Sequence, residues 1–182
     1  MKKDLLLVID MQNVYQPGNE WGCENMPEAT LNIKKLLDNE NKNYDVMFTE
    51  YLPSENPKGV WKEYNIVNKN VNEDEYLNEI VDELKPYLKD YPLHSKSVYS
   101  SMKIDEVAKA CEEANRLVVS GVVSECCVLS TVLDAIDMGY KVIYLKDACA
   151  GFTFETEKAV LKVFEGLIPL HIEVMTTEEY LQ

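Results

Sequence analysis

Short apolar runs that alternate with longer amphipathic stretches constrain the fold of this chain most strongly. Four runs have the length and composition of strands buried on both faces: residues 5–9, 45–49, 116–122 and 141–145. Apolar residues recur at helical spacing between and after these runs, at residues 28–41, 74–90, 103–115, 125–138 and 155–166. The alternation predicts an α/β, Rossmann-like three-layer fold, in which helices cover both faces of a mostly parallel sheet.

Two weaker strand signals complete the predicted sheet. They are "YPLHSK" at residues 91–96 and "LHIEVM" at residues 170–175, which bring the total to about six strands. A chain of 182 residues is long enough for one sizeable core. We therefore expect a single domain over residues 1–182.

The net charge indicates which partners to expect, and the cysteines indicate the redox compartment. A net charge of −14 without a basic run disfavours binding to nucleic acid or to an anionic membrane, so a small molecule is the expected partner. The first residues carry no signal-type cleavage site, and no later apolar run has transmembrane length. Five scattered cysteines fit a reducing compartment better than a disulfide framework, and we expect a cytoplasmic protein.

Three chemically active side chains stand at predicted strand ends. Asp10 follows the first strand, Lys96 ends the "YPLHSK" segment, and Cys127 follows the turn after residues 116–122. Because ligands of open α/β sheets bind beyond the carboxyl ends of the strands, an acid, an amine and a thiol can converge there. The long connection at residues 49–72 has the length of a lid or binding loop.

Two adjacent cysteines, Cys126 and Cys127, open the helix predicted after this turn. If Ser124 caps that helix, both thiols lie in the first turn, where the helix dipole favours a thiolate. The predicted core face of the helix puts Cys127 beside the strand ends and Cys126 nearly opposite, so spacing favours Cys127. Cys23, Cys111 and Cys149 are interpreted as ordinary buried residues.

Four segments in order resemble the cysteine hydrolases of the isochorismatase-like superfamily. "GVVSECCV" is similar to the family's nucleophile motif, in which Cys127 matches the catalytic cysteine and Cys126 a variable position. "LLLVIDMQNVY" resembles the first strand with its catalytic aspartate, Asp10, and "KSVYSSM" the segment that begins with the catalytic lysine, Lys96. "GYKVIYLKDACAG" resembles the strand that follows the nucleophile. The resemblance covers roughly residues 4–170.

The triad implies hydrolysis of a C–N bond in a small amide, carbamoyl or ureido compound through a thioester-type intermediate. Lys96 would lower the pKa of the Cys127 thiol, and Asp10 would carry its proton to the leaving group. The resemblance also implies an oxyanion site beside a non-proline cis peptide, with the amides of Val123 and Ser124 as donors. The cis bond would be Val122–Val123 or Val123–Ser124.

The resemblance also bears on metal binding and on the residues that would contact the substrate. Nicotinamidase members carry a histidine-containing metal motif after the second strand, whereas "FTEYLPSENPKG" has no histidine, so we expect neither a metal nor another cofactor. Trp21 and Tyr99 are candidate substrate-binding residues, and Gln12 and Thr131 are expected to satisfy local backbone groups. Met102 and Glu157 depart from the residues common in the family, and the substrate stays open.

The resemblance implies a homodimer or a homotetramer. Two other functions remain open: a vinyl-ether hydrolase of the isochorismatase type, in which Asp10 protonates the substrate and the thiol is incidental, and a catalytically idle scaffold or small-molecule binder.

Overall fold

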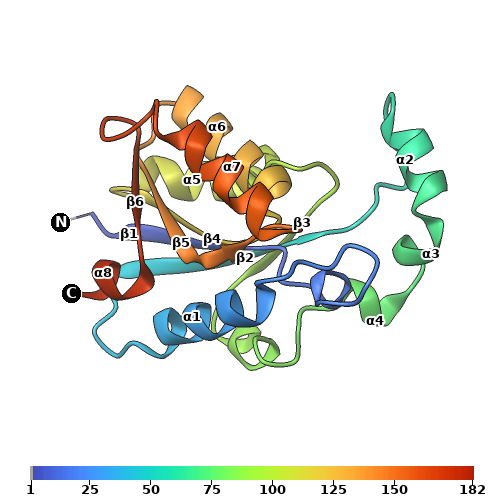
Figure 1. The fold of residues 1–182 in the computed structure, drawn as a ribbon, viewed down its shortest axis with the longest axis horizontal. Helices are drawn as coiled ribbons and strands as arrows, with labels where there is room; N and C mark the ends of the chain where they lie inside the picture. The colour runs from blue at the N-terminus through green and yellow to red at the C-terminus, as the bar shows by residue number, and fades with distance from the viewer. Residues whose placement is uncertain (1) are drawn as a thin grey trace.

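The computed structural model describes residues 2–182 and contains a six-stranded, wholly parallel sheet (Figure 1). The order across the sheet is β3-β2-β1-β4-β5-β6. The strands are β1 (Asp4–Ile9), β2 (Tyr44–Tyr51), β3 (Leu93–Lys96), β4 (Leu117–Val122), β5 (Val142–Ala150) and β6 (Ile172–Met175). The predicted α/β fold with about six strands is confirmed, including both of the weaker strand candidates.

Helices cover both faces of the sheet. On one face lie α1 (Met26–Asp38) and α8 (Thr177–Leu181), and on the other lie α5 (Asp105–Glu113), α6 (Leu129–Asp137) and α7 (Phe154–Phe164), as Figure 1 shows. Between residues 2 and 182, no helix is both long enough and apolar enough to cross a membrane.

Side chains of the central strand β1 alternate between two hydrophobic cores. Leu6 and Val8 pack into the core beneath α1, whereas Leu5, Leu7 and Ile9 pack into the core beneath α5, α6 and α7. Because successive strand residues point to opposite faces, a continuous apolar run is what a strand covered on both sides requires. This is the physical reason why the apolar runs of the sequence predict the sheet.

A glycine allows β4 to lie unusually close to β1 near their carboxyl ends. Gly121 pairs with Ile9 and has a φ of +108°. A Cβ atom at this position would lie 2.1 Å from the backbone oxygen of Ile9, a distance that no side chain tolerates. The residue therefore holds together the two strands that lead to Asp10 and to Cys127.

The prediction of one helix over residues 74–90 is wrong. Only α4 (Glu75–Asn78) and a 3₁₀ turn (Lys85–Lys89) form there, because the chain between them pairs with the segment after β1. Ile80 forms an isolated bridge with Gln12, and the amide of Val81 donates to the carbonyl of Met11 at 2.9 Å. The predicted loop at residues 49–72 contains two short helices, α2 (Trp61–Val67) and α3 (Lys69–Asn72).

Candidate active site

Asp10 lies directly after β1 in a left-handed backbone conformation, with a φ of +52°. Aspartate tolerates this conformation better than most residues. The amide of Asp10 donates to the carbonyl of Thr49 at 2.9 Å, and the amide of Gln12 donates back to the carbonyl of Asp10 at 2.7 Å. The chain thus turns sharply at the strand end and directs a completely buried carboxylate across the edge of the sheet.

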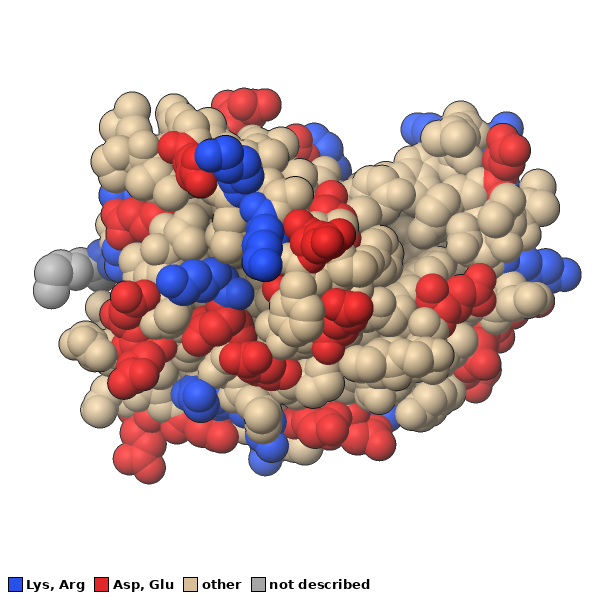
Figure 2. Space-filling model, in the orientation of Figure 1, with Lys and Arg blue, Asp and Glu red and all other residues tan. Residues whose placement is uncertain are grey.

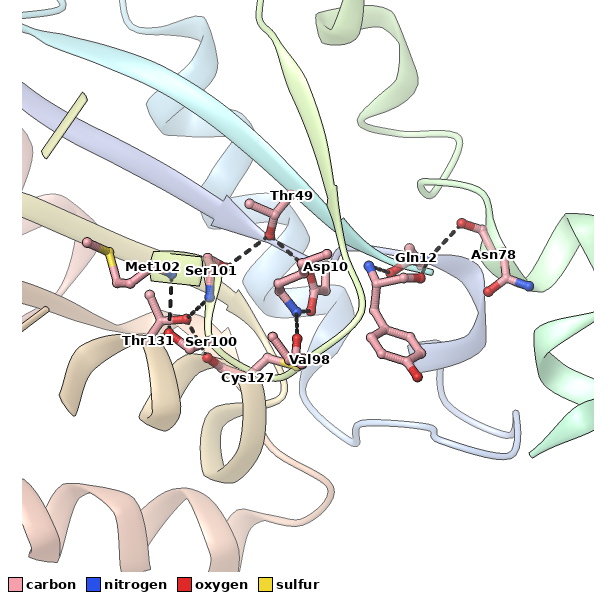
Figure 3. A network of polar contacts seen from close by, with 12 residues as sticks. Asp10, Gln12, Thr49, Asn78, Val98, Ser100, Ser101, Met102, Cys127 and Thr131 are labelled. Atoms are coloured by element: carbon pink, nitrogen blue, oxygen red, sulfur yellow. Dashed lines mark hydrogen bonds and ion pairs between the residues drawn. The ribbon is translucent and has the colours of Figure 1, made fainter. Parts of the chain in front are cut away.

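Lys96 ends β3 and reaches past β2 to this carboxylate. Its ammonium group lies 2.5 Å from Oδ2 of Asp10 and also donates to the carbonyl of Val98 at 3.2 Å. The two side chains are 1% and 0% exposed. Two opposite charges removed from water stabilise each other's ionised form only at such close range. The carboxylate and the carbonyl of Val98 lie beside Cys127 in Figure 3.

Cys127 lies in a short π-helical turn, Ser124–Val128, that leads into α6. Its side chain is buried, and its thiol interacts electrostatically with both Asp10 and Lys96. The expectation that Ser124 caps this helix is wrong, because its hydroxyl instead accepts a hydrogen bond from Tyr144 at 3.2 Å. The carbonyl of Val123 accepts from the amides of Cys126 and Val128, and this backbone arrangement holds the turn.

The expected depression of the Cys127 pKa is also wrong for the resting protein. Burial raises the pKa of Cys127 above its ordinary value of 9.0, the Asp10 carboxylate raises it further, and Lys96 opposes them only in part. Burial alone would lower the pKa of Lys96, but Asp10 and Cys127 outweigh burial and raise it. These directions favour a Cys127 thiol that keeps its proton beside the pair of Asp10 and Lys96.

Hydroxyl groups connect the acid to the turn that carries the thiol. Thr49 donates to Oδ1 of Asp10 at 2.9 Å and lies 3.4 Å from the hydroxyl of Ser101. The amide of Ser101 donates to Oγ1 of Thr131 at 2.9 Å, and Thr131 donates to the carbonyl of Cys127 at 2.7 Å (Figure 3). Sequence reasoning missed both residues: Thr49 stands outside the four quoted segments, and Ser101 lies in "KSVYSSM" without being singled out there.

Two residues expected to act locally make longer connections. Thr131 binds the carbonyl of Cys127 four residues earlier, as expected, but also the amide of Ser101. The side chain of Gln12 accepts from the amide of Tyr51 at 2.8 Å and donates to the carbonyls of Tyr51 at 2.9 Å and Asn78 at 2.8 Å. Gln12 thus fastens the end of β2 and the segment of α4 to the site, which is a longer-range role than the one expected.

The turn before Cys127 contains the cis peptide at Val122–Val123, the first of the two positions considered. Within residues 2–182, the amides of Val123 and Ser124 donate to no protein acceptor. The amide hydrogen bonds of these two candidate oxyanion donors are thus not used within the described protein.

Both predicted substrate-binding aromatics belong to one cluster of rings. Trp21 lies against Tyr15, Tyr51 and Tyr64, with ring centroids 5.8–6.3 Å apart. Tyr99 lies 5.1 Å from Trp61 and is 40% exposed. The six residues of this aromatic cluster are Tyr15, Trp21, Tyr51, Trp61, Tyr64 and Tyr99. Figure 2 shows a mostly uncharged hollow between the main body and the lobe that carries α2 and α3.

Cys126 lies nearer to this aromatic cluster than expected for a residue on the side of the helix away from the strand ends. It is partly buried and interacts electrostatically with Tyr64 and Tyr99. Burial raises the pKa of Cys126, and the Glu125 carboxylate adds to the increase. Cys126 thus lies near the aromatic cluster. The pKa of Cys127 responds to Asp10 and Lys96, whereas the pKa of Cys126 is raised by burial and by Glu125. Cys23, Cys111 and Cys149 are buried, as predicted.

The residues after β2 do not fit the metal site of the family's nicotinamidase members. The corresponding stretch, "FTEYLPSENPKG" at the end of β2 and just after it, contains no histidine and so provides no imidazole ligand. His94 lies within β3, and His171 precedes β6 at the opposite end of the sheet. Among residues 2–182, no group of three histidine, cysteine, aspartate or glutamate side chains is placed to hold a metal ion.

Comparison with known proteins places the chain in one family. Residues 4–179 match the family model described as an isochorismatase domain. The chain is 28% identical to the uncharacterized isochorismatase family protein YddQ of Bacillus subtilis, over 97% of this chain and 98% of that protein.

Among solved structures, a cysteine hydrolase from Pseudomonas syringae superposes with a TM-score of 0.82 at 22% identity, over 98% of this chain and 91% of that one. A pyrazinamidase from Pyrococcus horikoshii, solved with zinc, superposes with a TM-score of 0.75 at 21% identity, over 96% and 99%. The α/β fold, the site at its carboxyl edge and the family match lead to one conclusion. The chain belongs to the isochorismatase family and is an isochorismatase-like hydrolase.

Proposed function

We propose that this protein hydrolyses a C–N bond in a small amide, carbamoyl or ureido compound, with Cys127 as nucleophile, Asp10 as proton carrier and Lys96 as electrostatic partner. The observation that carries the proposal is the buried ion pair of Asp10 and Lys96, beside a buried thiol. A fully buried charged pair is costly to maintain, and strongly perturbed titratable groups concentrate at catalytic sites. The pyrazinamidase among the structural neighbours acts on an amide, which supports this class of bond.

The first half of the reaction transfers the thiol proton and breaks the C–N bond. As the sulfur of Cys127 attacks the carbonyl carbon, its proton passes to Asp10, and the amides of Val123 and Ser124 donate to the developing oxyanion. Asp10 then gives the proton to the leaving nitrogen, the C–N bond breaks, and a thioester remains on Cys127. Lys96 stays an ammonium group throughout and stabilises the negative charge on whichever partner holds it.

The second half hydrolyses the thioester. Asp10 accepts a proton from water while the water oxygen attacks the thioester carbon, and the collapse of the tetrahedral adduct releases the acid product. The leaving thiolate of Cys127 takes the proton back from Asp10, which restores the resting thiol. The raised pKa of the free thiol suits this cycle, because the thiolate exists only while substrate is being converted.

Intact-protein mass spectrometry of rapidly quenched reactions tests the proposal. The wild type is mixed with a panel of small amides and ureido compounds, beside Cys127→Ala and the matched neighbour variant Cys126→Ala. We expect an acyl adduct on Cys127 in the wild type and in Cys126→Ala, whose kcat stays within about a few fold, and neither adduct nor turnover in Cys127→Ala. Turnover of these compounds that survives Cys127→Ala would instead support hydrolysis that does not use the thiol.

A further inference from the structure

The hydroxyl group of Tyr51 is buried without a hydrogen-bond partner in the described part of the chain. Tyr51 is 3% exposed, and no donor or acceptor contacts its Oη. Two other buried tyrosines are satisfied: Tyr44 donates to the carbonyl of Leu36 at 2.7 Å, and Tyr144 donates to the hydroxyl of Ser124. An unpaired buried hydroxyl destabilises a fold, so folding alone gives no reason for a tyrosine here.

The backbone of Tyr51 is also held firmly, and its ring is buried beside Lys96. Gln12 binds both the amide and the carbonyl of Tyr51, as described above. Tyr51 pairs with Lys96 across β2 and β3, and the ammonium group of Lys96 lies 5.8 Å from the centre of the tyrosine ring. The phenol is therefore fixed to the same strand ends that carry the reacting groups.

The surroundings of the ring are aromatic and lie next to the thiol. Trp21, Trp61 and Tyr64 have ring centroids 6.1, 6.4 and 6.3 Å from that of Tyr51. Burial raises the pKa of Tyr51 to about 12, and Tyr99, Cys127 and Asp10 add to the increase. The phenol consequently keeps its proton near neutral pH, so it is a hydrogen-bond donor within electrostatic range of the nucleophile.

We propose that Tyr51 determines substrate specificity, by donating a hydrogen bond to a neutral acceptor on the acyl portion of the substrate. A carbonyl, ether or ring-nitrogen atom would serve, while the apolar surface of the same molecule faces Trp21, Trp61 and Tyr64. An anionic acceptor is disfavoured, because Asp10 already compensates the charge of Lys96. This inference rests on the proposed function and names the chemical class of its substrate: a compact amide with a second, neutral acceptor.

Pairs of amides that differ only in the acceptor test this inference. Suitable pairs are pyridine-3-carboxamide with benzamide and methoxyacetamide with butanamide, assayed with the wild type, Tyr51→Phe and the matched control Tyr44→Phe. We expect the wild type to prefer the acceptor-bearing member of at least one pair by about tenfold to a hundredfold in kcat/KM. Tyr51→Phe should lose this preference without a decrease in Tm, whereas Tyr44→Phe should keep the preference and unfold at a lower temperature.

Two results would overturn the role of Tyr51. One is a preference that survives in Tyr51→Phe. The other is a loss of stability in Tyr51→Phe as large as that in Tyr44→Phe, which would give the hydroxyl a structural partner such as a bound water. Hydrolysis that survives Cys127→Ala is a separate outcome, because it would contradict the proposed function rather than the specificity of the pocket.

Discussion

Strand β1 carries a buried carboxylate at each end, and the two are bonded differently. Asp4, at the amino end, accepts four hydrogen bonds: from Asn115, from Nε and an amino group of Arg116, and from the hydroxyl of Tyr180. Asp10, at the carboxyl end, is bound by Lys96 and Thr49 and lies beside a thiol. The acceptor sites of Asp4 are therefore filled, whereas Asp10 can still take a proton.

Replacement of the carboxylate that can take a proton should have the largest effect. Asp10→Asn keeps the shape of the side chain and tolerates the left-handed backbone, but it cannot carry the thiol proton. We expect kcat to fall by roughly a thousandfold or more. Steady-state kinetics on a hydrolysed amide measures this, with Asp4→Asn as the matched control. A comparable loss of kcat in Asp4→Asn would erase the distinction between the two ends.

The same substitution at the amino end of β1, Asp4→Asn, should affect stability rather than turnover. In Asp4→Asn the guanidinium of Arg116 loses its closest charged partner and keeps only Glu173 at 4.0 Å, while Asn115 and Tyr180 lose a strong acceptor. We expect the free energy of unfolding to fall by about 1–3 kcal/mol, with kcat nearly unchanged. Urea denaturation gives the value. An unchanged denaturation midpoint would mean that the saturated carboxylate does not hold the amino edge of the sheet.

The dependence of stability on pH should also differ between the two ends of β1, because the thiol lies only at the carboxyl end. Because burial raises the pKa of Cys127, the folded thiol keeps its proton where the unfolded thiol, with an ordinary value of 9.0, loses it. The unfolded state then binds fewer protons, so stability falls as pH rises above about 9, by at most about 1.4 kcal/mol per pH unit for this group. The contribution of Lys96, whose folded pKa is raised, is present below 10.5 and lost at higher pH.

Two variants, measured beside the wild type, isolate the contribution of Cys127 in urea titrations between about pH 8 and pH 10. Cys127→Ala should lose stability less steeply than the wild type, because its unfolding no longer releases the thiol proton. Asp4→Asn should be less stable throughout, with the slope of the wild type. An equal slope in the wild type and Cys127→Ala would contradict a raised pKa at the thiol.

Removal of metal ions should have the smallest effect. The donors after β2 do not fit a metal site, and the proposed reaction uses only side chains of the triad and two backbone amides. We expect kcat to be unchanged after exhaustive treatment with EDTA, measured beside an untreated sample. A loss of turnover that zinc or iron restores would show that Asp10 shares its role with a metal ion.

The sequence predicts the sheet and the positions of Asp10, Lys96 and Cys127 because these depend on short-range patterns. A buried strand has a recognisable composition, and parallel strands bring their carboxyl ends to one edge. The remaining features depend on contacts between distant segments. The hydrogen bonds of Thr49 to Asp10 and of Gln12 to Tyr51 each span 39 residues, and no local sequence pattern predicts them.

The same reasoning explains the errors. The amphipathic pattern at residues 74–90 favours a helix, but the bridge between Ile80 and Gln12 outweighs that local preference. The neighbours of Cys127 along the chain and in the motif favour a lowered pKa of its thiol. Its actual direction depends on complete burial, which only the packed structure determines. The choice between the two peptide bonds before Cys127 likewise required coordinates.

The contact at Gly121 divides the site into a part that is fixed and a part that can vary. Backbone packing of β4 on β1 sets the distance between the strand ends that lead to Asp10 and to Cys127, and any side chain at this position would disturb that packing. Under the proposed function, the walls that meet the substrate are instead side chains of the aromatic cluster, such as Trp21, Trp61 and Tyr99. Mutations in that cluster can therefore change which molecule is accepted, while the distance between the strand ends stays the same.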